Sequence, residues 1–267
     1  MFKNVTLGQF FPGNSVIHRL DPRTKLLMTL GMIAAVFMSG SFTGYVLVFA
    51  YIFMAASITE LGMRFLVRGI KPILTIVAIT FFLNMFFTSG GEALIEWKFI
   101  RVTDIGVKNA AYMAIRLILL VLGTQILTLT TSPIALTDGI ERLFHPLTKI
   151  GFPAHELAML MSIALRFIPT LLEEADKIMR AQMARGADFE SGNLLKRAKA
   201  MVPLMVPLFV SAFRRADDLA LAMEARCYRG GAGRTRMKVL KYARIDLYAA
   251  GTMFVLFAAV LLTRGLI

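Results

Sequence analysis

The stretch "LLMTLGMIAAVFMSGSFTGYVLVFAYIFMAASI", residues 26–58, decides the fold of this chain. A membrane-spanning helix needs about 20 apolar residues, so this block is too long for one crossing and slightly short for two. Its interruption, "SGSFTG" at 39–44, is a turn signal and favours two short helices joined by a tight hairpin. Two crossings also place the basic flanks of the block on one side of the membrane, as the positive-inside rule requires. These flanking residues are Arg19, Arg23 and Lys25 before the block and Arg64, Arg68 and Lys71 after it.

The composition supports the same class of protein. Of 267 residues, 57% are hydrophobic, and they include 21 Phe and 17 Met, which indicates an all-α, polytopic membrane protein. A net charge of +13 would suggest nucleic acid in a soluble protein. Here positive-inside bias and anionic headgroups explain the charge, so we expect a lipid bilayer and no nucleic acid as partner. We also expect no cleavable signal peptide, because "MFKNVTLGQFFPGNS" lacks an apolar core.

Three more apolar segments predict spans at 72–88, 110–129 and 245–262. The loop at 89–109 shows no basic excess, which suits the outer side of the membrane. Its centre, "EWKFIRVTDIGV", alternates enough for a short strand or an irregular hairpin, and the sequence leaves both open. Five crossings would place the N-terminus and residues 130–244 in the cytoplasm and the C-terminus outside.

Residues 130–244 predict three long amphipathic helices. The first begins at "TSPIALTDGIERL", with Ser132 as N-cap and Pro133 at the first helical position. The second runs from about 153 to 185 and ends at Gly186, which suits a left-handed C-cap. The third runs from about 193 to 227, and Pro203 and Pro207 should kink or break it. The chain then divides into an N-terminal flank (1–25), four transmembrane helices (26–129), this cytoplasmic region (130–244), and a last span with a short tail (245–267).

The second and third of these helices end alike. "ADKIMRAQMARG" (175–186) and "ADDLALAMEARC" (216–227) share Ala-Asp and a final Ala-x-x-Ala-Arg at a constant offset of 41 residues. Alanine favours helices and arginine favours their C-termini, which is the commonplace explanation. Each end nevertheless offers small residues beside one long cation with five donors, an arrangement that suits docking of another protein.

No catalytic or nucleotide-binding motif is found in the sequence. Walker A, H-E-x-x-H, G-x-S-x-G and Rossmann glycine patterns are absent, so we expect a non-enzymatic chain without a cofactor. Two alternatives stay open. One is an integral membrane enzyme acting on a lipid-linked substrate, with His145, His155 and Glu156 as its local candidates. The other is a membrane anchor whose segment "RTRMKVLKYAR" (234–244) binds nucleic acid or anionic lipid.

Four segments in order carry a family resemblance: "HRLDPRTKLL" (18–27), "TTSPIALTDGIERL" (130–143), "ALRFIPTLLEEADKIMRAQMARGADF" (164–189) and "AMEARCYRG" (222–230). Together they resemble the transmembrane T component of energy-coupling factor (ECF) transporters. The resemblance implies a non-catalytic scaffold in a bacterial cell membrane. Its partners would be two ABC-type ATPase subunits, A and A′, which bind ATP and Mg, and a membrane S component that binds a vitamin or another micronutrient.

In that family two long coupling helices end in Ala-Arg-Gly-type motifs that insert into grooves on the two ATPases. By resemblance the motifs fall here on Ala184, Arg185, Gly186, Ala225, Arg226 and Cys227. Cys227 stands in place of glycine, so the easy left-handed cap is lost and the third helix is expected to run on to Gly230. The surface facing the S component should include parts of residues 134–168 and 200–213.

Overall fold

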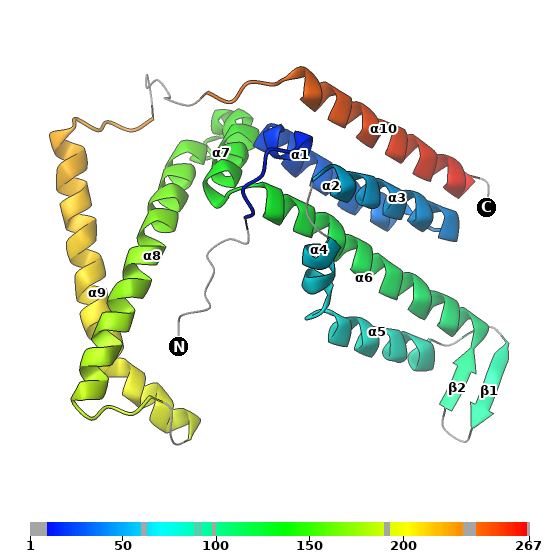
Figure 1. The fold of residues 1–267 in the computed structure, drawn as a ribbon, viewed down its shortest axis with the longest axis horizontal. Helices are drawn as coiled ribbons and strands as arrows, with labels where there is room; N and C mark the ends of the chain where they lie inside the picture. Colours follow the sequence, from blue (N-terminus) through cyan, green and yellow to red (C-terminus); the bar gives the residue numbers. More distant parts are fainter. Residues whose placement is uncertain are drawn as a thin grey trace. The chain divides into compact units, whose positions relative to one another are not determined.

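The structure is a computed structural model that describes residues 10–59, 63–88, 90, 92–97, 100–189, 193–231 and 239–265 (Figure 1). The described chain forms two compact units. The first contains the residues up to Gly139 together with those from Val239 onward, and the second contains Ile140 to Gly231. The first nine residues of the predicted N-terminal flank and residues 234–238 of the basic segment lie outside the described residues.

The first unit is a helical bundle with one small hairpin. Its elements are α1 (Val16–Arg19), α2 (Pro22–Met38), α3 (Phe42–Ile58), α4 (Met63–Ile70), α5 (Leu74–Phe87), β1 (Ala93–Trp97), β2 (Ile100–Thr103), α6 (Asp104–Thr130) and α10 (Arg244–Gly265), and α7 (Pro133–Phe144) begins in it.

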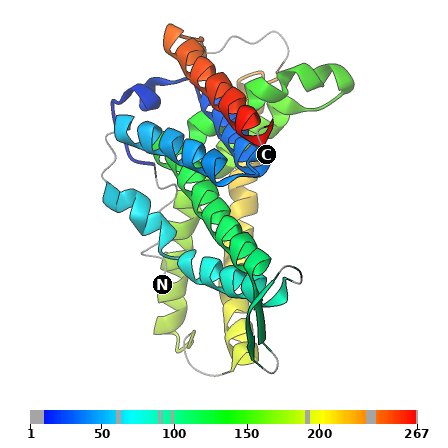
Figure 2. The ribbon, with the colours of Figure 1, turned by 90° about the vertical axis from the view of Figure 1, so that its right-hand side faces the viewer.

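The centre of this bundle is packed by α2, α3, α6 and α10, and α2 and α3 each contact both α6 and α10. Figure 2 shows this group of helices from the side. Each of the four helices contributes one aliphatic side chain that is almost wholly buried: Val36, Val48, Leu119 and Val260. Gly123 lets α6 approach α2, because a Cβ at this position would lie 1.9 Å from Cε of Met32. Some apolar side chains of these helices therefore form a core between them, and the remaining apolar side chains are left to face lipid.

The five predicted spans correspond to α2, α3, α5, α6 and α10. The predicted hairpin after α2 is confirmed, because α2 ends at Met38 and Ser41 caps α3 by accepting a hydrogen bond from the backbone N–H of Gly44 at 3.2 Å. By length and composition α6, α8 and α10 could each cross a membrane, and α3 and α5 are shorter apolar helices. The chain is an all-α, polytopic membrane protein.

The predicted outer loop is shorter than expected. Residues 93–97 and 100–103 pair as the antiparallel strands β1 and β2, which favours the hairpin of the two alternatives that the sequence left open. The next helix begins at Asp104, six residues before the predicted start at 110. Thr103 fixes this start, because its hydroxyl accepts a hydrogen bond from the backbone N–H of Gly106 at 3.1 Å.

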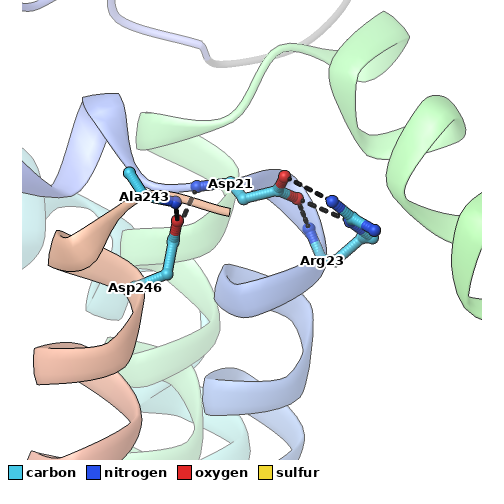
Figure 3. A network of polar contacts seen from close by, with 4 residues as sticks. All are labelled: Asp21, Arg23, Ala243 and Asp246. Atoms are coloured by element: carbon cyan, nitrogen blue, oxygen red, sulfur yellow. Dashed lines mark hydrogen bonds and ion pairs between the residues drawn. The ribbon is translucent and has the colours of Figure 1, made fainter. Parts of the chain in front are cut away.

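A polar network joins the starts of α2 and α10 (Figure 3). Asp246 accepts the backbone N–H of Asp21 at 2.9 Å with one carboxylate oxygen and that of Ala243 at 2.7 Å with the other. Asp21 in turn forms an ion pair with Arg23 at 2.9 Å, and the Arg23 guanidinium lies 4.0 Å from the ring centre of Tyr242. Burial alone would raise the pKa of Asp21, but the hydrogen bonds and charge of Arg23 outweigh it and hold that pKa below its usual range.

The second unit holds the end of α7, a 3₁₀ helix η2 (His145–Ile150), α8 (Ala154–Ala184) and α9 (Leu194–Ala225). The three predicted amphipathic helices are therefore confirmed as helices, and Ser132 caps α7 through the backbone N–H of Ala135 at 3.3 Å. Of the predicted kink or break in α9, the break does not occur, because one helix continues through Pro203 and Pro207. Each proline removes a single intrahelical hydrogen bond, which a helix tolerates by bending. Figure 1 shows α9 changing direction in its first half.

Candidate functional site

The end of α8 is closed by a left-handed cap. The helix stops at Ala184, and Gly186 adopts a φ of 87°. Its backbone N–H donates to the carbonyl of Met183 at 3.0 Å, while the N–H of Ala187 donates to the carbonyl of Gln182 at 3.0 Å. These two bonds define a Schellman motif, and they place Arg185 at the turn where the chain leaves the helix.

The end of α9 has the same geometry, although it carries no glycine. Cys227 adopts a φ of 54°, and its backbone N–H donates to the carbonyl of Glu224 at 2.8 Å. The N–H of Tyr228 donates to the carbonyl of Met223 at 3.0 Å, so α9 stops at Ala225. The expectation that this helix runs on to Gly230 is wrong. The left-handed conformation costs a non-glycine residue about 1–2 kcal/mol. The two capping hydrogen bonds outweigh this cost.

The six motif residues thus occupy equivalent positions on two equivalent caps. All are exposed: Ala184, Arg185, Gly186, Ala225, Arg226 and Cys227. Among the described residues, the guanidinium groups of Arg185 and Arg226 make no hydrogen bond or ion pair. Neither arginine therefore serves the fold of its own unit, and each offers five unused donors.

The two helices that carry these ends run antiparallel. Glu174 of α8 contacts Ser211 and Arg215 of α9, whereas Met179, farther along α8, packs with Leu204, earlier in α9. The two helix ends therefore point in opposite directions, as Figure 1 shows for α8 and α9.

A polar contact holds the two helices together between their ends. Arg215 Nη2 lies 2.8 Å from Glu174 Oε2, and the Ser211 hydroxyl donates to the other oxygen of the same carboxylate. We call Glu174, Ser211 and Arg215 the helix clamp. The hydrogen bonds from Ser211 and Arg215 lower the pKa of Glu174, so this carboxylate, which lies in the polar half of α8, is charged at neutral pH.

The clamp was not predicted from the sequence. A signal was present, however. Glu174 and Arg215 are separated by the repeat offset of 41 residues and come directly before the matched alanines Ala175 and Ala216. Two repeated helices that run antiparallel can cross at the same repeat position. An ion pair forms there only if that position carries opposite charges in the two helices, as Glu174 and Arg215 do.

An apolar face of α9 is left uncovered within its unit. Leu204, Leu208, Ser211 and Arg215 form the less exposed side, which includes the contacts with α8. We call the remaining side the α9 apolar face; its exposed members are Met201, Val202, Met205, Val206, Phe209, Val210 and Phe213. Such a continuous apolar surface marks a membrane or protein contact.

The residues of the enzyme alternative have other surroundings. His155 Nδ1 lies 3.0 Å from the carboxylate of Glu141, whose side chain is largely buried and which the sequence had not singled out. His145 begins η2, and Glu156 is exposed in the first turn of α8. In the part of the chain that the structure describes, no three His, Cys, Asp or Glu residues are grouped so that they could hold a metal ion.

Comparison with known proteins adds an independent line of evidence. A family model described as CbiQ, cobalt transport protein, matches residues 13–239. The chain is 54% identical over 265 residues to the energy-coupling factor transporter transmembrane protein EcfT of Clostridium kluyveri, covering 99% of this chain and 98% of that protein. It is 54% identical over 264 residues to that of Acidaminococcus fermentans, covering 99% and 98%. It is 46% identical over 265 residues to that of Bacillus subtilis, covering 99% and 100%. The chain therefore belongs to the family of energy-coupling factor transporter transmembrane proteins, the T components that its sequence resembles.

Proposed function

We propose that this chain couples ATP hydrolysis by two partner ABC-type ATPases to the uptake of a micronutrient bound by a membrane S component. The observation that carries this proposal is the pair of matched helix ends. Arg185 and Arg226 sit on caps with the same pair of hydrogen bonds, both are exposed, and their guanidinium groups make no hydrogen bond or ion pair among the described residues. Two such ends suit two similar docking grooves, one on each ATPase subunit.

The antiparallel arrangement of α8 and α9 explains how such docking could transmit force. Arg185 follows Glu174 by eleven residues, and Arg226 follows Arg215 by eleven. Each end therefore lies about 16 Å along its own helix from the clamp, on opposite sides of it. When ATP binding closes the ATPase dimer, each subunit moves one helix end, and the two helices change their crossing about the clamp.

The change of crossing would reach the S component through the apolar surfaces of the same helices. The α9 apolar face has a high content of Met, Val and Phe, and Leu157, Leu160 and Met161 are exposed in the first half of α8. Flexible Met-rich surfaces can repack against different partners. We therefore propose that the S component contacts these faces and that it is released or reoriented when the helices move.

The same proposal fixes the orientation in a bacterial cell membrane. Docking to soluble ATPases requires α8 and α9 to end in the cytoplasm, and the basic flanks of the first apolar block place the N-terminus on that side as well. ATP and Mg would bind to the ATPase subunits and not to this chain.

Purification of the tagged chain from its native membrane in a mild detergent tests the proposal. We expect two ATPase chains, identical or different, and at least one small apolar membrane protein to copurify with it. Recovery of the chain alone, together with activity on a lipid-linked substrate, would favour the membrane enzyme.

A further inference from the structure

The first unit contains an apolar cavity of about 250 Å³ that the coupling function does not use. It lies among α1, α2, α3, α6 and α10. Part of its lining comes from residues at helix ends, namely Lys25, Ile58, Thr130 and Ile245. From there it extends to Met32, two turns deeper along α2, or about 10 Å.

The cavity has a buried floor and an open rim. Met32, Ile52 and Ile126 of the floor are each at most 9% exposed, whereas Val16, Met54 and Tyr248 of the rim are 45–74% exposed. An apolar chain could therefore enter from the side of the bundle and lie against a preformed surface. The rim includes a tyrosine, a residue enriched where membrane proteins meet the headgroup region.

One end of this cavity carries a buried cation. Lys25 is 7% exposed, and its ammonium donates to the carbonyls of His18 at 3.1 Å and Thr130 at 2.9 Å. An ammonium has three N–H donors, so one has no acceptor among the described residues. Within the described chain no carboxylate lies within ion-pair distance of Lys25 either. A buried charge without a contacting counter-charge is costly unless a ligand supplies one.

We propose that this cavity binds one anionic phospholipid, with an acyl chain along the floor and the headgroup phosphate at the Lys25 end. The cavity chemistry favours this occupant over simpler ones. A free phosphate would leave the apolar floor empty, and a zwitterionic lipid would add a second cation to a site that already holds one. Basic pockets between membrane helices near the cytoplasmic surface are a known mode of anionic lipid recognition.

Native mass spectrometry of the full chain, purified in mild detergent and exposed to defined lipids, tests the proposal. The probes are phosphatidylglycerol, phosphatidylethanolamine and inorganic phosphate alone. We expect the wild-type chain to retain one phosphatidylglycerol under conditions that strip phosphatidylethanolamine. Lys25→Met should lower the preference for phosphatidylglycerol roughly fivefold or more, as expected for loss of one lysine charge.

A second variant keeps the test valid if Lys25→Met does not fold. Ala249→Phe fills the cavity from α10 without changing its charge, and it should abolish lipid retention. Val255→Phe, on the same helix at a position that is 66% exposed and outside the cavity lining, is the matched control and should retain the lipid. Equal retention of both lipids by the wild-type chain, unchanged retention by Lys25→Met or Ala249→Phe, or displacement of the lipid by inorganic phosphate would each overturn the proposal.

Discussion

Glu174 and Arg215 occupy the same position in two helices that repeat at an offset of 41 residues, and their side chains meet at 2.8 Å between those helices. The ion pair therefore joins α8 and α9, and its two residues each lie eleven residues before Arg185 and Arg226, respectively. In the proposed mechanism this ion pair is the pivot, and its equal distance from both ends would let the movement of either end reach the other helix in the same way.

The clamp predicts a charge-swap rescue. Arg215→Glu faces Glu174 with a second carboxylate, so the helices should cross loosely while both ends still dock. We expect the ATPases to copurify normally and the contact between the helices to weaken by about 1 kcal/mol, as for a partly exposed ion pair. The uptake per ATP hydrolysed in proteoliposomes should then fall severalfold. The double variant Glu174→Arg with Arg215→Glu should recover most of the coupling. A wild-type ratio in the single variant would show that the clamp has no part in transmission.

The left-handed caps predict that introducing a glycine at one helix end raises stability and that removing the glycine at the other end lowers it. Cys227→Gly relieves a positive φ and should raise stability by up to about 1 kcal/mol with normal uptake. Gly186→Val imposes that strain on a β-branched residue and should destabilise the end of α8 by about 1–2 kcal/mol. Thermal unfolding in detergent and uptake assays measure the two effects. If Cys227→Gly folds well but loses most of its uptake, the thiol itself contacts a partner.

The polar network between α2 and α10 predicts that substitution of Asp246 strongly lowers the free energy of unfolding. Asp246→Ala leaves the backbone N–H of Asp21, which is buried, and that of Ala243, which is only partly buried, without their acceptor. The loss should be about 2–3 kcal/mol, since bonds to a charged acceptor disappear. Asp246→Asn keeps one acceptor oxygen and should lose about half as much. Thermal unfolding of the purified chain compares the two variants, and equal stability of Asp246→Ala and the wild type would refute the role of the network.

The α9 apolar face predicts that one substitution can remove the S component while the ATPases stay bound. Phe209→Ser changes a side chain that is 56% exposed, so the chain should fold and retain its ATPases but lose the S component. Leu204→Ala, on the buried side of the same helix, should instead destabilise the second unit by about 2–3 kcal/mol. Copurification from native membranes measures the loss of the S component, and thermal unfolding in detergent measures the loss of stability. Retention of the S component by Phe209→Ser would place its contact on another surface.

Much of this fold could be predicted because hydrophobicity and turn chemistry are local signals. The block at 26–58 gave the right hairpin, and Ser132 with Pro133 gave the start of α7, since caps and turns depend on a few adjacent residues. The early start of α6 was missed because the polar residues at 104–109 were assigned to a loop by their charge. Thr103 caps the helix before them, and charge does not prevent helix formation.

What failed in the sequence interpretation depended on contacts between distant residues or on small energy balances. The clamp links Glu174 to Ser211 and Arg215, and no pattern within one helix shows which face meets its neighbour. Cys227 was expected to disrupt its cap, but two backbone hydrogen bonds compensate for its strain. The cavity around Lys25 is formed by five separate helices and has no signature in the sequence.

The central claim is that Arg185 and Arg226 hold the two ATPases, and the double variant Arg185→Glu with Arg226→Glu tests it most directly. Arg180→Glu with Arg214→Glu, at two exposed positions of the same helices outside the six motif residues, is the matched control. The measurement is the amount of each ATPase that copurifies per tagged chain from membranes in which both variants insert normally. We predict normal recovery with the control and at least a tenfold loss with the double variant, since truncating a buried interface arginine costs about 2 kcal/mol or more. Wild-type recovery of both ATPases with the double variant would contradict the account.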